Sequence, residues 1–151
     1  MDQATKISGY SIFEDKNLIT YGILEVDQKE KNYVERIKQM NGKIIQLINN
    51  NNPGFVVFED VQFQRNYQTY QQLSQLQGVI MANLFDLNLG FQIIEPSGWK
   101  SFCGIKGKKR EEQKKSTQEF VKNKYGIDVS EDEADAIGIG IWAINKIRTV
   151  I

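Results

Sequence analysis

The 151-residue chain contains no histidine, one cysteine and two prolines. The lack of histidine excludes Ser-His-Asp and Cys-His catalytic sets and a zinc ion bound by histidine. The single cysteine, Cys103, excludes an internal disulfide and is typical of a reducing compartment. No apolar run approaches the roughly 18 residues of a membrane span, and the N-terminus lacks a signal peptide's apolar core. We therefore expect a cytoplasmic protein with no membrane partner, whose chemistry relies on carboxylates, lysines or tyrosines.

Charge is balanced over the whole chain but not along it. Nineteen basic residues offset nineteen acidic ones, yet residues 99–124 hold nine basic and three acidic residues, a local charge of +6. Residues 104–110 combine two glycines with four basic side chains, Lys106, Lys108, Lys109 and Arg110. This pattern favours a flexible loop that follows a phosphate backbone. The alternative interpretation is a lysine-rich face exposed to solvent.

The spacing of apolar residues predicts one α/β domain over residues 1–151. Residues 55–58 form a continuous apolar run, as expected of a strand buried on both faces. The expected elements are strands at 8–13 and 18–26, a helix within 29–48, a strand at 55–58, a helix with the apolar stripe Tyr70, Leu73, Leu76, Ile80 and Leu84, a strand at 89–94, and helices at 110–124 and 131–149.

Acidic residues stand at the ends of several expected elements. Asp2 precedes the first strand, Glu59 ends the buried strand, and Asp132 and Asp135 share one face at the start of the last helix. Ser130 and Glu133 form the S-x-x-E pattern of a capping box, which predicts where that helix begins. Taken singly, each acid could be a surface charge or a favourable charge at a helix N-terminus.

Taken together, these acids can meet at one edge of the sheet, where they would repel one another unless hard cations lie between them. Oxygen ligands without histidine favour Mg²⁺, with Mn²⁺ as a substitute, over zinc. Two such ions about 4 Å apart can stabilise the attacking and leaving oxygens of phosphodiester hydrolysis. The pattern predicts no organic cofactor.

Three stretches in this order resemble the RuvC family of Holliday junction resolvases, in the ribonuclease H-like superfamily. They are DQATKISGY from Asp2, VVFED from Val56, and DEADA from Asp132. The likeness extends over essentially the whole chain and is greater to the phage branch than to the bacterial one. It implies a mixed five-stranded sheet flanked by helices, and a location in the host cytoplasm if a phage encodes the chain.

The resemblance also implies a function. The chain would nick branched DNA as a homodimer, with a metal-activated water attacking the phosphodiester. The expected catalytic and metal-binding residues are Asp2, Glu59, Asp132 and Asp135, and Lys100 matches a basic residue near the family's active site. The expected DNA contacts are Phe63, Arg65, Lys100, Lys106, Lys108, Lys109 and Arg110. We expect the helix with the Leu73–Leu84 stripe near the dimer interface, although that stripe could instead pack only on its own sheet.

One departure from the family concerns the central strand. The family usually has four or five apolar residues before its first aspartate, whereas only Met1 precedes Asp2 here. We therefore expect the first strand of the sheet to be shortened at its N-terminus.

The aromatic residues allow two interpretations each. Phe63 could stack on an unpaired base or pack under the following helix, and Trp99 and Phe102 could form a base platform or belong to the core. Trp142 fits the core better, and Gly138 and Gly140 beside it would let the last helix approach the sheet closely.

Two other functions remain open from sequence. One is a ribonuclease H that cuts the RNA of an RNA–DNA hybrid. The other is a module that binds branched DNA without cutting it, which the shortened first strand favours.

Overall fold

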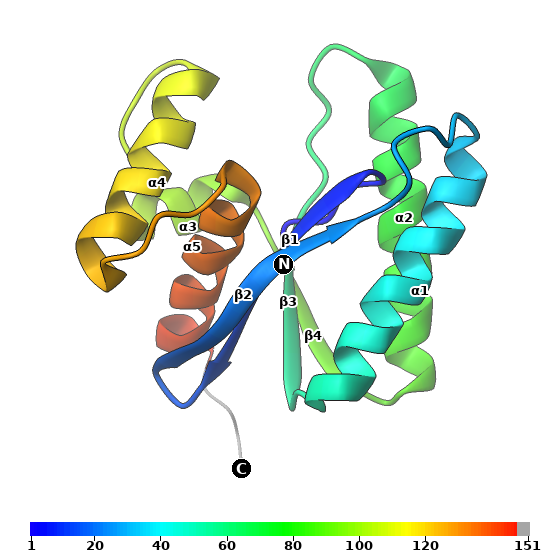
Figure 1. Cartoon of the computed structure of the whole chain (residues 1–151), viewed down its shortest axis with the longest axis horizontal. Helices are drawn as coiled ribbons and strands as arrows, with labels where there is room; N and C mark the ends of the chain where they lie inside the picture. Colours follow the sequence, from blue (N-terminus) through cyan, green and yellow to red (C-terminus); the bar gives the residue numbers. More distant parts are fainter. Residues whose placement is uncertain (148–151) are drawn as a thin grey trace.

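The computed structural model describes residues 1–147 and confirms an α/β protein (Figure 1). The predicted strands and long helices are present within a few residues of their expected positions. The predicted end of the last helix, Thr149, lies outside the described residues. In order, the elements are β1 (Ile7–Glu14), β2 (Asn17–Glu25), α1 (Tyr33–Asn51), β3 (Phe55–Glu59), α2 (Tyr67–Asp86), β4 (Gly90–Ile94), α3 (Pro96–Cys103), α4 (Arg110–Tyr125) and α5 (Glu131–Lys146).

The strands form two pairs rather than one continuous sheet. β1 and β2 are antiparallel, with Ile7 opposite Glu25 and Glu14 opposite Asn17. β3 and β4 are parallel, from Phe55 opposite Gly90 to Glu59 opposite Ile94. The expected sheet of five strands is therefore not confirmed, because residues 1–147 contain four strands in two pairs.

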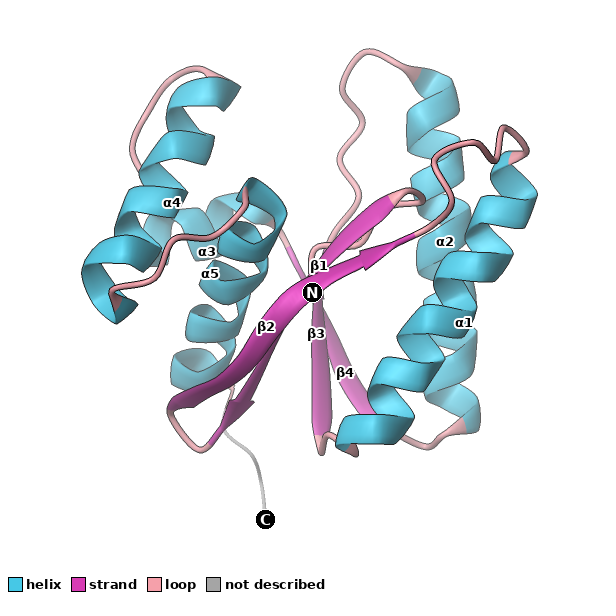
Figure 2. Ribbon diagram, viewed as in Figure 1, coloured by secondary structure: helices cyan, strands magenta, loops and turns pink. Residues whose placement is uncertain are grey.

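Residues 1 and 2 join the two pairs, and Figure 2 shows the N-terminus in the middle of the strands. Asp2 exchanges two backbone hydrogen bonds with Gly9, each 2.9 Å long. The Met1 amino group donates to the Val57 carbonyl at 2.7 Å, and the Met1 carbonyl accepts from the Glu59 amide at 3.2 Å. Asp2 and Gly9 thus form an isolated bridge rather than a full strand.

Helices cover both faces of the strands (Figure 1). One apolar cluster joins α1 and α2 to the strands and includes the fully buried Phe58 and Met40. A second joins α3, α4 and α5 to the strands and includes the fully buried Trp99 and Ile137. Val56 packs against the first cluster and Val57 against the second, so β3 meets apolar side chains on both faces, as predicted.

The apolar stripe of α2 belongs to the first cluster. Leu76, Ile80 and Leu84 are at most 1% exposed, so these side chains pack on their own core and are not available to a second subunit. If α2 takes part in a dimer, it must do so through its other face.

The short helix α3 was not predicted, because its eight residues are too few to show a helical period. Pro96 lies in its first turn, where the missing N–H would have no intrahelical partner. Gly104 ends the helix in the left-handed conformation, at φ 70°. This helix matters because it carries Trp99 and Lys100.

Glycines allow α5 to lie directly on the strands, as predicted for Gly138 and Gly140. A side chain at Gly138 would overlap the Trp99 ring, and one at Gly140 would overlap the Phe13 ring. None of the helices described within residues 1–147 is long and apolar enough to cross a membrane.

Candidate active site

The fold brings together the segments that carry the four predicted carboxylates. Asp2 lies in the bridge between the strand pairs, and Glu59 is the last residue of β3. Asp132 and Asp135 lie in the first two turns of α5, which packs on β1. Gly9, the pairing partner of Asp2, permits this close packing, because a side chain there would overlap the Asp132 carbonyl group.

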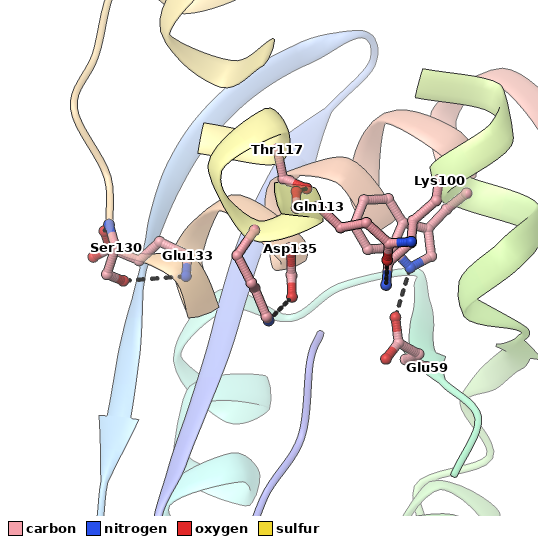
Figure 3. A network of polar contacts seen from close by, with 9 residues as sticks. Glu59, Lys100, Gln113, Thr117, Ser130, Glu133 and Asp135 are labelled. Carbon is pink, nitrogen blue, oxygen red and sulfur yellow. Dashed lines mark hydrogen bonds and ion pairs between the residues drawn. The ribbon is translucent and has the colours of Figure 1, made fainter. Parts of the chain in front are cut away.

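The start of α5 is set by the predicted capping box, which the structure confirms. The Ser130 hydroxyl accepts a hydrogen bond from the Glu133 amide at 3.2 Å, and the Glu133 carboxylate accepts one from the Ser130 amide at 2.9 Å (Figure 3). The cap satisfies N–H groups that the helix itself leaves free. It thereby defines the turn from which Asp132 and Asp135 project.

The acids influence one another electrostatically. Burial, together with the negative charges of Glu59 and Asp135, raises the pKa of Asp2 to about 7. Burial and the charge of Asp135 raise the pKa of Glu59, although a hydrogen bond from Trp99 opposes the rise. Burial also raises the pKa of Asp132, against the charge of Lys114. These carboxylates are therefore harder to ionise than exposed ones, as expected for acids that converge with too little positive charge nearby.

Lys114, which the sequence analysis did not select, lies among these acids. Its ammonium group forms an ion pair with the Asp135 carboxylate, and the two side chains are 16% and 8% exposed. Burial lowers the pKa of Lys114, but the contact with Asp135 and the charge of Asp2 outweigh burial and leave that pKa raised. A sequence signal did exist, because position 114 lies two helical turns before the apolar Val121 and therefore shares its face.

Glu59 is oriented by Trp99. The indole Nε1 of this fully buried residue donates to a Glu59 carboxylate oxygen at 2.6 Å (Figure 3). Trp99 is therefore part of the core, and the base-platform interpretation is wrong for it. The Lys100 ammonium group lies 5.6 Å from the Trp99 ring centre, donates to the Gln113 side chain at 3.2 Å, and opposes the rise in the pKa of Glu59. Lys100 thus borders the acids.

The acids are not arranged as a complete metal-binding site. Among residues 1–147, no three acidic or cysteine side chains lie close enough together to hold one ion. Asp135 faces Lys114 and Glu59 faces Trp99, so two of the four carboxylates already have partners within the protein. Metal binding by the set remains a prediction.

The predicted basic loop borders the same site. Lys106, Lys108, Lys109 and Arg110 are exposed, and Arg110 begins α4, the helix that carries Lys114. The charge of Arg110 acts on the pKa of both Lys114 and Asp132.

Two side chains anchor the backbone of this loop. The Lys106 amide donates to the Ser116 hydroxyl, and the Lys108 amide donates to the Glu112 carboxylate, each at 2.9 Å. Gly107 adopts φ 122°, and a side chain there would also collide with Glu112. These contacts hold the backbone of a loop that the sequence predicted to be flexible, and its cations remain exposed.

The structure shows different surroundings for the remaining aromatic residues. Phe63 is 61% exposed in the loop after β3 and meets Tyr70 edge-on, with ring centres 5.5 Å apart, so it is not buried under α2. Arg65 is exposed in the same loop. Phe102 is 42% exposed beneath Lys146, and Trp142 packs against the α3–α5 cluster as predicted.

The fold and the site together define an α/β protein whose acids converge at the ends of β3 and α5. The family model for crossover junction endodeoxyribonuclease RuvC matches residues 1–143, and the chain belongs to this family. The RuvC of Halothermothrix orenii is 26% identical over 98% of this chain and 92% of its own length. The RuvC of Brachyspira hyodysenteriae is 25% identical over 93% of this chain and 88% of its own length.

A solved structure gives the same fold. Thermus thermophilus RuvC in complex with a Holliday junction substrate superposes with a TM-score of 0.74 and 14% identity, over 93% of this chain and 88% of that one. The expected family and its ribonuclease H-like fold are thus confirmed, whereas placement in the phage branch stays a prediction.

Proposed function

We propose that this chain is a Mg²⁺-dependent endonuclease that nicks branched DNA such as Holliday junctions. The observation that carries the proposal is the convergence of Asp2, Glu59, Asp132 and Asp135 in a chain of the RuvC family. The relatives named above are crossover junction endodeoxyribonucleases, and one neighbour was solved on a junction substrate.

By its chemistry, though not by its spacing within residues 1–147, the donor set suits a hard divalent cation. Its ligands are all carboxylate oxygens, and the raised pKa values of Asp2, Glu59 and Asp132 show repulsion or burial that a cation would relieve. Lys114 already supplies one positive charge at Asp135. We propose Mg²⁺, replaceable by Mn²⁺, with two ions per site; bound there, they would activate water and stabilise the oxygens of the phosphodiester.

The protein's own cations have separate roles in this proposal. Lys114 contacts one carboxylate oxygen of Asp135, so a metal ion held there would compete with it, and a displaced Lys114 could pair with a phosphate oxygen. Lys100 is held near Glu59 by Gln113 and orients the scissile phosphate. The exposed cations of residues 106–110 contact the DNA backbone farther from the reaction, and Phe63 and Arg65 contact the junction centre.

The chain would act as a homodimer in the cytoplasm. Two symmetric nicks across a four-way junction require two sites related by a twofold axis. Since the apolar stripe of α2 is buried within one subunit, we place the exposed face of that helix near the axis. Sedimentation at tens of micromolar should show a dimer, and a monomer both with and without junction DNA would contradict this part of the proposal.

A substrate panel tests the activity. The unmodified chain is incubated with a four-way junction, an RNA–DNA hybrid and a linear duplex, each in Mg²⁺, Mn²⁺ and EDTA. We expect nicks in the junction only, and only with a divalent ion. Cleavage of the RNA strand in the hybrid would indicate a ribonuclease H instead. Binding to the junction without any cut in either metal would indicate a binding module.

A further inference from the structure

Trp99 contacts two of the elements that carry the acids of the site. Its indole Nε1 donates to the Glu59 carboxylate of β3 at 2.6 Å, along the dashed line at Glu59 in Figure 3. The other half of the ring lies against Gly138 of α5, where a Cβ atom would come within 2.5 Å of Cζ3 and 2.7 Å of Cε3. Trp99 is fully buried, so one enclosed ring reaches from β3 to α5.

Gly138 places the ring one helical turn beyond Asp135. Residues three apart lie on the same face of a helix, and Asp132, Asp135 and Gly138 follow one another at this spacing. Because the indole ring is planar and rigid, its width fixes how far the Glu59 carboxylate lies from this face of α5. Any side chain at position 138 would have to move the ring or the helix. The contact therefore sets the spacing between Glu59 and the two aspartates.

The local sequence explains why Trp99 can reach both elements. Ile94 of β4 pairs with Glu59, and α3 begins two residues later at Pro96. Helical side chains lean toward the N-terminus of their helix, so Trp99 leans back toward the end of β3. The short helix α3 thus brings an N–H donor to the carboxylate that ends β3.

The hydrogen bond engages one Glu59 oxygen and leaves the other open. Oε2 accepts from Trp99, and among the described residues no side chain or backbone N–H donates to Oε1. Oε1 is not sealed in the core either, because within residues 1–147 the single fully buried side-chain oxygen or nitrogen without a partner belongs to Gln3. A carboxylate held in this way offers one oxygen, from a fixed position, to a cation.

We propose that Trp99 is a positioning residue of the nuclease site, whose ring fixes the spacing between Glu59 and the acids of α5 and holds Glu59 with one oxygen free. This inference rests on the proposed function, because it takes Glu59 as a ligand of the divalent ion. Mg²⁺ demands near-octahedral geometry, so a ligand that can shift binds it less well. Loss of the hydrogen-bond partner of a ligating carboxylate typically costs about 10- to 100-fold in metal affinity or activity.

A pair of glycine variants tests the contact without changing any acid. Gly138→Ala puts a methyl group into the Trp99 ring, whereas Gly140→Ala makes the same change farther along α5 and meets the Phe13 ring instead. NMR of isotope-labelled protein, without DNA or metal, follows the exchange of the Trp99 indole proton. Gly138→Ala should speed this exchange at least about tenfold relative to Gly140→Ala, because the N–H loses its charged acceptor. Equal exchange in the two variants would overturn the proposal.

A pair of tryptophan variants tests the consequence for the reaction. Trp99→Phe removes the N–H, and Trp142→Phe is the matched control, because Trp142 packs against the same α3–α5 cluster. Both are assayed at a temperature at which circular dichroism shows them folded. At a saturating junction concentration in Mg²⁺, the nicking rate should be about 10- to 100-fold lower in Trp99→Phe than in Trp142→Phe. Equal nicking rates would overturn the proposal.

Junction affinity in EDTA separates positioning from damage to the DNA-binding surface. It should be the same in both tryptophan variants, because the buried Trp99 ring cannot touch DNA. A loss of affinity that accounts for the whole loss of nicking would overturn the positioning role. If the unmodified protein cuts no substrate, the proposed function fails, but the exchange of the Trp99 indole proton uses no DNA and still decides whether the ring holds Glu59.

Discussion

The two sides of the molecule each hold a cation through side-chain contacts, and both the burial and the partners differ, because Arg36 is buried whereas Lys114 is only partly buried. On the α1–α2 side, Arg36 is 8% exposed, and within residues 1–147 it forms no ion pair with a carboxylate. Its guanidinium donates to the Glu30 and Lys31 carbonyls at 3.2 and 3.0 Å and to the Thr5 and Gln72 side chains at 3.4 and 3.2 Å. These neutral acceptors fix the loop after β2 to α1 and α2.

On the α3–α5 side, Lys114 pairs with a carboxylate that is surrounded by further acids. Another cation could take the place of Lys114, because attraction to Asp135 depends mainly on charge. No metal ion could replace the directed fork of hydrogen bonds that Arg36 makes. Arg36 is thus a cation that holds the fold together, whereas Lys114 is a cation whose place a metal ion can take.

The largest effect should follow changes to the acids on the α3–α5 side. Asp135→Asn and Glu59→Gln should each reduce junction nicking at least about a hundredfold, because an amide oxygen is a poorer ligand for Mg²⁺. Junction binding in EDTA should stay the same or become tighter, since a negative charge near phosphate is removed. Gel shift and cleavage on one junction measure both quantities.

Exposed acids provide matched controls for this experiment. Asp86→Asn at the end of α2 and Glu119→Gln on α4 make the same chemical changes away from the cluster. Both control variants should cut the junction at the rate of the unmodified protein. The assignment of the site is wrong if Asp135→Asn and Glu59→Gln cut as fast as these controls.

The comparison of the two cations can be tested by stability. Arg36→Met should lower the free energy of unfolding by about 3 kcal/mol, because it leaves several buried acceptors without a donor. Lys114→Met should cost about 2 kcal/mol in EDTA, because it leaves Asp135 without its counter-charge. Urea unfolding in EDTA and in millimolar Mg²⁺ gives both values.

Magnesium should distinguish the two variants. It should restore most of the stability lost in Lys114→Met, because the ion supplies the missing charge, and restore none in Arg36→Met. If Mg²⁺ restores both variants or neither, the two cations do not differ in the proposed way.

The basic loop should affect DNA affinity rather than stability. Replacing Lys108, Lys109 and Arg110 together with alanine should weaken junction binding about tenfold and reduce the salt slope by up to about three, one for each lost phosphate contact. The control replaces Lys16, Lys29 and Lys43, which are exposed on the β1–β2 turn, the loop before α1, and α1. Equal slopes for the two triple variants would mean that residues 108–110 are only a solvated surface.

The smallest effect concerns pH in the absence of metal. The pKa of Asp2 is about 7 in the folded protein against an ordinary 3.8. Between these two pH values, Asp2 carries a proton in the folded state but not in the unfolded state. Its contribution to the free energy of unfolding therefore falls as pH rises, by at most about 1.4 kcal/mol per pH unit. The Met1 amino group has a lowered pKa, so it makes the stability increase as pH rises, mainly between pH 6 and 8.

Measurements at pH 5 to 6 therefore isolate the carboxyl contribution. Unfolding in EDTA should lose stability across this interval, and Asp2→Asn should show a shallower dependence because the titrating group is gone. An identical pH dependence in both proteins would mean that Asp2 is ionised normally.

Local patterns in the sequence determined much of this protein. Three features depend on patterns within a few residues and could be predicted. They are the capping box at Ser130, the apolar run that ends in Glu59, and the spacing of Asp132 and Asp135. The order of the acidic motifs was also enough to indicate the family, which the family model confirms.

Only the tertiary structure decided how these elements meet. The contacts of Lys114 with Asp135 and of Trp99 with Glu59 join residues 21 and 40 positions apart, and they depend on how α3 and α4 pack beside α5. The same holds for the burial of the Leu76–Leu84 stripe within one subunit and for the separation of the strands into two pairs. Periodicity shows which face of an element is apolar, but the partner of that face is set by packing across the whole chain.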